Sequence, residues 1–326
     1  MIQAFIQAFD RRIAHISLKL GRERTSLISF LFHGLFVDEG EARSGVVDPQ
    51  QEFTLEHFKR FTAYFSSRGF RFVFPADLIT GSLDPEVNHV LITFDDGYES
   101  SRRVLPILEE FGAPAVFFIV TDNVLNGRAF WWDVVYRERL KQGRLVQEVS
   151  REQRVLKSKR YDEIEAYLIK HFGAGALDPV CDTDRPMTPD ELKQLAGHPL
   201  AHIGNHTRHH AILTNYTKEE MDCEIRGGQE DLKTLVGQAP MFVSYPNGNI
   251  SPQVIDVAQN TQDIRLGITT IHQKDQLPLS RDRRSLLLFN RFMLWGNDEI
   301  EEQCLCCRSN FGLAGWLQRL KGYLGR

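Results

Sequence analysis

The stretch Val90-Leu-Ile-Thr-Phe-Asp-Asp-Gly-Tyr98 joins an apolar run to two adjacent carboxylates. The apolar run is typical of a buried β-strand, and Gly97 allows the chain to turn directly after it. Two acidic side chains at the end of a buried strand repel each other and are costly to desolvate unless a cation lies beside them. Asp95 and Asp96 therefore predict a charged site at the carboxyl end of this strand, although the pattern alone also fits a plain turn.

Strand-like and helix-like segments alternate on both sides of this stretch. Thr54 precedes a helical pattern and is the expected N-cap, and capping boxes predict helices after Thr188 and Thr217. Strands that alternate with helices indicate parallel βαβ units, and 326 residues are enough for an α/β barrel. The predicted strands are 27–32, 90–94, 115–120, 201–205, 241–245, 265–270 and 289–294.

Three regions are expected along the chain: an N-terminal amphipathic helix (1–26), a central α/β domain (27–295) and a C-terminal helical tail (296–326). A polar, helical insertion from about 126 to 187 interrupts the central domain. Nine Lys or Arg stand against three Glu between Arg137 and Arg160. This insertion is interpreted either as a solvated set of helices or as a basic lid over a phosphate-bearing substrate.

Net charge, apolar runs and cysteine content argue against several classes of protein. The formal charge of −4 argues against bulk binding to nucleic acid, and no apolar run approaches the roughly 18 residues of a membrane span. Five cysteines, an odd number, predict no disulfide framework. The first 20 residues lack a basic region followed by an apolar block, so we expect a cytoplasmic protein. The amphipathic ends leave peripheral contact with the inner membrane face open.

A second constellation is His206-Thr-Arg-His-His210. His206 and His210 are four residues apart, which predicts two imidazoles on one face of a helical turn. Two neutral imidazoles and one carboxylate are ligands that a catalytic zinc uses while it keeps a position open for water. The neighbouring His202 and His209 are assigned no ligand role, and a histidine-rich loop without a function is the alternative.

A third constellation is Ser244-Tyr-Pro-Asn-Gly248, where a predicted strand runs into a turn. This turn could present the backbone N–H of Tyr245 to a site. Taken alone, it fits a simple strand-to-loop connection equally well.

Together, the order T-F-D-D-G, H-T-x-x-H about 110 residues later, and S-Y-P-x-G resembles the polysaccharide deacetylase family (NodB-like, carbohydrate esterase family 4). The resemblance covers roughly residues 27–294. Trp131-Trp-Asp133 and Asn290-Arg-Phe292 are similar to segments of the bacterial surface-polysaccharide branch of this family.

The resemblance implies a distorted (β/α)7-type barrel and a hydrolase that removes N-acetyl groups from amino sugars with one divalent metal ion, zinc being the expected one. It implies Asp96, His206 and His210 as metal ligands. Asp95 matches the general base that takes a proton from the metal-bound water, and the backbone N–H of Tyr245 matches the oxyanion donor.

Two departures from the family pattern matter for the site. Ser244 stands where most members carry an arginine that orients the base, and Arg291 is a candidate to supply that charge from elsewhere. No L-x-H motif is evident near the C-terminus, where many members keep a histidine acid. His33, after the first predicted strand, is the favoured acid, and His272 is the alternative.

The expected substrate is an N-acylated amino sugar of a surface polysaccharide, or its nucleotide- or lipid-linked precursor. Two other functions remain open. One is an N-formyl or other deacylase acting on a sugar, because the same metal chemistry serves each acyl group. The other is a catalytically inactive glycan-binding module of the same fold, which the Ser244 departure favours.

Overall fold

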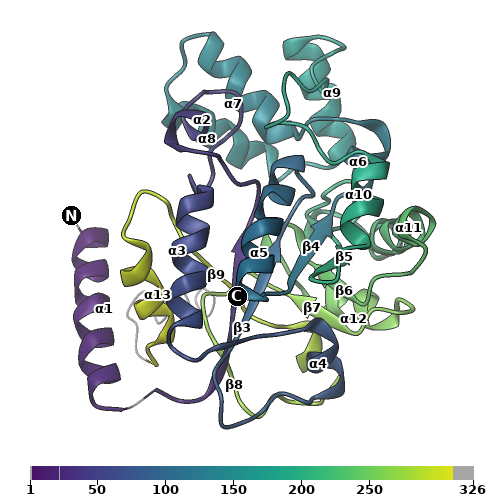
Figure 1. The fold of residues 1–326 in the computed structure, drawn as a ribbon. Helices are drawn as coiled ribbons and strands as arrows, with labels where there is room; N and C mark the ends of the chain where they lie inside the picture. The colour runs from purple at the N-terminus through teal and green to yellow at the C-terminus, as the bar shows by residue number, and fades with distance from the viewer. Residues whose placement is uncertain (1, 22, 311–326) are drawn as a thin grey trace.

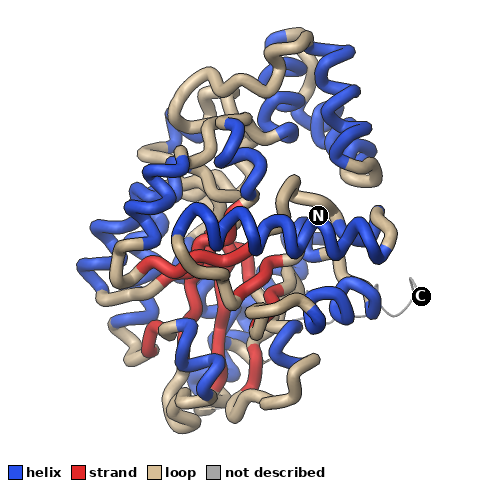
Figure 2. Tube along the Cα trace, turned by 90° about the vertical axis from the view of Figure 1, so that its right-hand side faces the viewer, coloured by secondary structure: helices blue, strands red, loops and turns tan. Residues whose placement is uncertain are grey.

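The computed structural model of the protein describes residues 2–21 and 23–310. Residues 311–326 of the predicted C-terminal helical tail lie outside these residues. Helices surround one curled, mostly parallel sheet, and the strands lie at the centre of the molecule (Figures 1 and 2). The prediction of a distorted α/β barrel is confirmed: the sheet forms a half-barrel.

The sheet has the strand order β7-β6-β5-β4-β3-β1-β8, with β2 beside β3 and β9 beside β1. All pairs are parallel except β1 with β8. The short β2 and β8 were not anticipated, because two residues carry no periodic signal. The strands are β1 (Ser26–Phe32), β2 (Arg71–Phe72), β3 (His89–Phe94), β4 (Ala115–Ile119), β5 (Ala201–Asn205), β6 (Phe242–Ser244), β7 (Leu266–Ile268), β8 (Asp275–Gln276) and β9 (Phe292–Met293).

The segment 289–293 connects the two sides of the sheet. Phe289 bridges Ile268 of β7, whereas Phe292 pairs with Phe30 of β1. The strand predicted over 289–294 is therefore broken, and only Phe292–Met293 forms β9. This break places Arg291 between the two pairings, where its side chain is fully buried.

Helices cover the sheet and begin where the sequence predicts caps. Thr54, Thr188 and Thr217 each accept a hydrogen bond in a capping box, as predicted. The helices are α1 (Ile2–Lys19), α2 (Glu39–Ala42), α3 (Leu55–Ser66), α4 (Pro75–Thr80), α5 (Leu105–Phe111), α6 (Thr121–Asn126), α7 (Trp131–Lys141), α8 (Val146–Leu156), α9 (Tyr161–Phe172), α10 (Pro189–Ala196), α11 (Lys218–Val236), α12 (Pro252–Asn260) and α13 (Ile300–Arg308), with short 3-10 helices η1 (Glu99–Val104), η2 (Leu213–Asn215), η3 (Pro246–Gly248) and η4 (Ser285–Leu287).

A phenylalanine-rich core lies between the sheet and α3. Phe30 and Phe32 of β1 contact Phe61 of α3 at ring-centroid distances of 4.8 and 5.2 Å, and Phe94 stacks on Phe117 at 4.9 Å. Aromatic pairs in this range add to the free energy gained by burial. This packing fixes the end of β3, from which the predicted carboxylates project.

Helices α7, α8 and α9 occupy the polar stretch and lie together at one end of the molecule, at the top of Figure 1. They have their own apolar core, which includes Phe130, Trp132, Val135 and Leu168. Several of their basic side chains are already paired with acids, such as Arg139 with Glu152. Much of the positive charge of this segment is therefore balanced locally.

Helix α13 lies between α1 and α3 (Figure 1). Arg11 pairs with Asp298, and His15 Nε2 lies 3.1 Å from Glu302 Oε2. Among the described residues, we find no helix that combines the length and the apolar character needed to cross a membrane.

Candidate active site

The paired carboxylates follow directly after β3. Phe32 pairs with Phe94 in the parallel ladder, so His33 and Asp95 are the next residues on two neighbouring strands. The Asp95 N–H continues this ladder with a 2.8 Å hydrogen bond to the Phe32 carbonyl. Asp96 then adopts a left-handed conformation with φ 76°. For a residue other than glycine this backbone is strained, a feature that clusters at functional sites, and both carboxylates end up buried.

The two metal-ligand candidates after β5 do not lie on a helical turn, so this prediction is wrong. His206 to His210 form an irregular loop in which Thr207 and His210 have φ angles of 65° and 52°. Side chains supply the hydrogen bonds that a helix would have made. The Thr207 N–H donates to Asn205 Oδ1 (2.8 Å), and the Ala211 N–H donates to Thr207 Oγ1 (3.0 Å).

The loop nevertheless brings both imidazoles to Asp96. Nε2 of His206 and Nε2 of His210 lie 3.4 and 3.5 Å from Asp96 Oδ1, and one ligand atom from each residue lies within 4.8 Å of the others. Two ligands of a tetrahedral zinc, each bonded at about 2.0 to 2.1 Å, lie about 3.3 Å apart. The spacing of the three side chains therefore fits a shared ion.

The protonation pattern also fits a cation. Asp96 Oδ1 is buried and accepts no hydrogen bond from any described residue. Nδ1 of His206 lies 2.9 Å from the Ser244 carbonyl oxygen. Because a carbonyl only accepts, Nδ1 carries a proton, so Nε2 is the nitrogen that can offer a lone pair to an ion beside Asp96, an arrangement found for metal-binding histidines. Burial lowers the pKa of His210 to about 3, which keeps that imidazole neutral, whereas the charges of Asp95 and Asp96 outweigh burial and raise the pKa of His206.

Arg291 supplies to Asp95 the guanidinium that is missing at position 244. Its Nη1 and Nη2 donate to the two oxygens of Asp95 at 2.7 and 2.8 Å, and Nη2 also donates to Ser244 Oγ at 2.9 Å. Burial raises the pKa of Asp95, but the charge of Arg291 outweighs it, and the pKa lies below its usual value. A guanidinium therefore reaches Asp95 from the segment 289–293 and not from position 244.

The Tyr245 assignment needs revision. Its backbone N–H donates to the Ile268 carbonyl over 3.3 Å and so extends the pairing of β6 with β7. An N–H engaged in the sheet is not free to bind an oxyanion. Pro246 has no N–H, so the next backbone donor of this turn is Asn247, which has φ 58° and donates to no carbonyl among the described residues.

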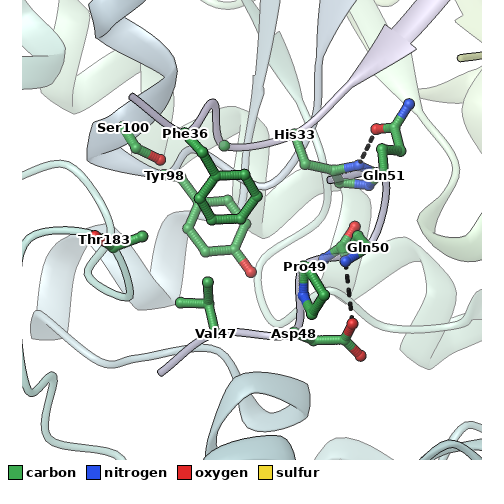
Figure 3. A pocket seen from close by; sticks show the side chains of 11 residues that line it. His33, Phe36, Val47, Asp48, Pro49, Gln50, Gln51, Tyr98, Ser100 and Thr183 are labelled. Atoms are coloured by element: carbon green, nitrogen blue, oxygen red, sulfur yellow. Dashed lines mark hydrogen bonds between the residues drawn. The ribbon is translucent and has the colours of Figure 1, made fainter. Parts of the chain in front are cut away.

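The two acid candidates have different surroundings. His33 is among the groups that lower the pKa of both Asp95 and Asp96. His272 instead lies 5.8 Å from the ring of Phe292, and burial alone lowers its pKa. A cavity of about 20 Å³ lies beside His33, between the loop 47–51 and Tyr98 (Figure 3). These surroundings favour His33 over His272 as the proton donor.

The insertion also places an aromatic side chain, Trp132, beside the candidate site. In the sequence, Trp131-Trp-Asp133 stands out only through its similarity to a segment of the family. The Trp132 ring lies 4.6 Å from the ring of His210. Its Nε1–H donates to the Tyr98 hydroxyl, which in turn donates to Asp133, both over 2.7 Å. Burial raises the pKa of Asp133 well above its usual value. This network holds Trp132 against one of the metal-ligand candidates.

Two solved structures share the fold. The Streptococcus pyogenes deacetylase PplD in complex with acetate aligns with a TM-score of 0.56 and 16% identity over 86% of this chain and 97% of its own. IcaB from Ammonifex degensii aligns with a TM-score of 0.58 and 16% identity over 88% and 99% of the two chains.

Sequence comparison agrees. YxkH of Bacillus subtilis, which carries the name of a polysaccharide deacetylase, is 20% identical over 226 residues. This alignment spans 68% of the chain but only 58% of YxkH. The sequence profile of the polysaccharide deacetylase family matches residues 83–263, more than half of the chain. The chain therefore belongs to the polysaccharide deacetylase family.

Proposed function

We propose that the protein is a metal-dependent hydrolase that removes the N-acetyl group from an amino sugar. One observation carries this proposal: Asp96, His206 and His210 converge, with an unpartnered buried carboxylate oxygen, beside the Asp95–Arg291 pair. Family membership supports it. The expected ion is zinc, since the donors are two imidazole nitrogens and one carboxylate oxygen.

Asp96, His206 and His210 would hold a divalent ion, which would lower the pKa of a water at the site and polarise the amide oxygen of the substrate. Asp95 stays ionised because Arg291 neutralises its charge, and it accepts a proton from the attacking water on a lone pair that the guanidinium leaves free. Ser244 Oγ, 3.1 Å from Asp95 Oδ2, helps to hold the carboxylate in place. His33 gives a proton to the nitrogen of the leaving amine.

This arrangement weakens the case for an inactive glycan-binding module. That alternative rested on the serine at 244. Because Arg291 contacts both oxygens of Asp95, the base keeps a guanidinium partner despite the substitution. The site is compatible with both acetyl and formyl substrates, so the assay described below compares these two acyl groups.

The substrate that we propose is linked to a nucleotide or lipid diphosphate and serves a surface polysaccharide. Lys157, between α8 and α9, places Nζ 2.9 Å from Asn247 Oδ1 in the turn after β6. Lys157 thus brings one positive charge of the insertion to the loop next to the candidate metal site, where it could meet a diphosphate. Exposed apolar side chains at Phe9 and Ile16 of α1, and at Leu20 directly after it, support the proposal of contact with a membrane surface.

We also propose that the protein works in the cytoplasm, at the inner membrane face. All five cysteines of the chain are free thiols. Free thiols are usual in a reducing compartment, whereas oxidising compartments favour disulfides. Cell fractionation tests this location: recovery of the protein in the periplasmic or secreted fraction would contradict it.

The test is an assay of the purified full chain, stripped of metal and reloaded with zinc. We expect stoichiometric zinc and release of acetate from at least one diphosphate-linked N-acetyl amino sugar, with free sugars and N-formyl analogues as comparisons. His202→Ala is the matched control for His206→Ala, because His202 lies on β5, the strand that leads to His206, packs against the Phe74 ring and is not one of the three residues whose ligand atoms converge. Stoichiometric zinc without release of acetate or formate from any substrate would contradict the proposal.

A further inference from the structure

Gln51 connects three parts of the site through one buried side chain. Its Nε2 donates to the carbonyl oxygens of Leu31 and Leu294 at 2.9 and 3.0 Å, and its Oε1 lies 2.8 Å from Nδ1 of His33 (Figure 3). Gln51 is only 4% exposed. Thus the end of β1, the segment after β9 and the candidate acid all meet at one amide.

These contacts determine which atoms carry protons. Both backbone carbonyls only accept hydrogen bonds, so the NH2 group of Gln51 must face them. Oε1 is then left for His33, and an oxygen acceptor requires that Nδ1 of His33 be the donor. In the neutral imidazole the proton therefore sits on Nδ1, and Nε2 is left free to take up a second proton.

The backbone around Gln51 is held in a strained form. Gln50 and Glu52, on either side, have φ angles of 48° and 51°. The Gly296 N–H donates to the Gln51 carbonyl oxygen over 2.7 Å, and a Cβ at Gly296 would lie 1.9 Å from the Glu52 carbonyl oxygen. Left-handed residues on both sides of a buried polar side chain persist only where the surroundings enforce them, as at functional sites.

We infer that Gln51 is a positioning residue that fixes the tautomer and the orientation of His33, so that Nε2 alone holds the proton delivered to the substrate. This inference rests on the proposed function, in which His33 is the acid. When the C–N bond breaks, the proton on Nε2 moves to the amine nitrogen and the ring returns to its neutral form. The proton on Nδ1 stays in place, because the amide of Gln51 does not accept it.

Three carboxylates lie around His33. Asp95 and Asp96 act on it electrostatically, and Asp48 lines the same small cavity. Gln51 adds a partner without charge. A change from Gln51 to a carboxylate therefore alters the charge beside Nδ1 while a hydrogen-bond acceptor remains there.

The first experiment uses Gln51→Met, which keeps the length of the side chain and removes both of its polar groups. We expect kcat to fall about 10- to 100-fold, as for other residues that orient a functional histidine, with KM and zinc content unchanged. Gln50→Met is the matched control, because the Gln50 side chain makes no hydrogen bond within the described part of the chain. Unchanged kcat in folded Gln51→Met would overturn the inference.

The second experiment reads the tautomer without activity. In ¹⁵N spectra of the full wild-type chain, with His33 assigned from the signal that His33→Asn lacks, Nδ1 should be protonated and Nε2 unprotonated at high pH. A protonated Nε2 in the neutral ring would overturn the inference, even if the proposed function failed and no acetate were released.

A third variant, Gln51→Glu, keeps the inference testable if Gln51→Met does not fold. Gln51→Glu places a negative charge beside Nδ1, which stabilises the imidazolium, so the alkaline limb of the kcat profile should move to higher pH. An alkaline limb at the same pH as in the wild-type enzyme would contradict the contact between Gln51 and His33.

Discussion

The two sides of the candidate site are built differently. On the metal-facing side, Asp96, His206 and His210 come from two short segments that directly follow β3 and β5. On the side that we propose moves protons, Asp95 and His33 contact Arg291 and Gln51, which come from other parts of the chain. The first side can be recognised in a motif, whereas the second exists only after the sheet has folded. Variants of the two sides should therefore fail in different ways.

The largest effect is expected on the metal-facing side. His206→Ala removes one of three ligand candidates, so we expect loss of zinc and a fall in activity on the order of 1,000-fold or more. His202→Ala should keep both zinc and activity. Metal analysis together with acetate release would check this, and an active His206→Ala enzyme would remove that residue from the ligand set.

The next effect falls on the base. Asp95→Asn keeps the shape of the side chain but cannot take up a proton, so we expect kcat to drop about 100- to 10,000-fold while zinc content is unchanged. Single-turnover assays on zinc-loaded protein would measure it. Retained activity with stoichiometric metal would show that another group is the base.

A third variant tests the contribution of the Arg291 charge separately from proton transfer by Asp95. Arg291→Gln leaves Asp95 buried without a counter-ion, and breaking a buried pair of this kind destabilises a protein by about 3 to 5 kcal/mol. We expect a matching loss of unfolding free energy and a lower kcat.

Ser244→Arg in the Arg291→Gln background should recover part of both quantities, because it returns a guanidinium to the position that is usual in the family. Equal stability of Arg291→Gln and wild type, measured by denaturant unfolding, would mean that the Asp95–Arg291 pair adds nothing to the fold.

The last effect concerns stability alone, at the anchor of the segment 289–293, and we expect little change in activity. Asp275 accepts hydrogen bonds from the backbone N–H and the side chain of Asn290, and burial raises its pKa from 3.8 to about 7. Between these pH values the folded state binds a proton that the unfolded chain has lost. The unfolding free energy should therefore fall as the pH rises from about 4 to about 7, by at most about 4 kcal/mol.

Asp275→Asn cannot ionise, so its stability should vary less over this range than that of wild type. Thermal unfolding at several pH values measures the difference, with the exposed Asp190→Asn as the control. Parallel curves for wild type and Asp275→Asn would show that Asp275 does not titrate in this way.

Local signals account for what the sequence predicts well. Val90 to Phe94 is apolar on both faces and forms β3, and the threonine caps start their helices as expected. The loop 206–210 was predicted as a helical turn, because spacing alone cannot show that Asn205 and Thr207 replace helical hydrogen bonds with their side chains.

Long-range pairing accounts for the rest. The contact between Arg291 and Asp95 depends on the break in the strand predicted over 289–294, and the Tyr245 N–H is taken up because β7 lies beside β6. Gln51 carries no signal in the sequence, because its three hydrogen-bond partners, His33, Leu31 and Leu294, lie in other parts of the chain. Such residues are identified by the hydrogen bonds that they make and not by spacing.

The most direct test of the central claim is anomalous diffraction at the zinc absorption edge from crystals of the zinc-loaded full chain. We expect one peak at about 2.0 to 2.2 Å from Asp96 Oδ1 and from Nε2 of His206 and His210. A chain without a peak there, or with zinc bound by other side chains, would contradict it.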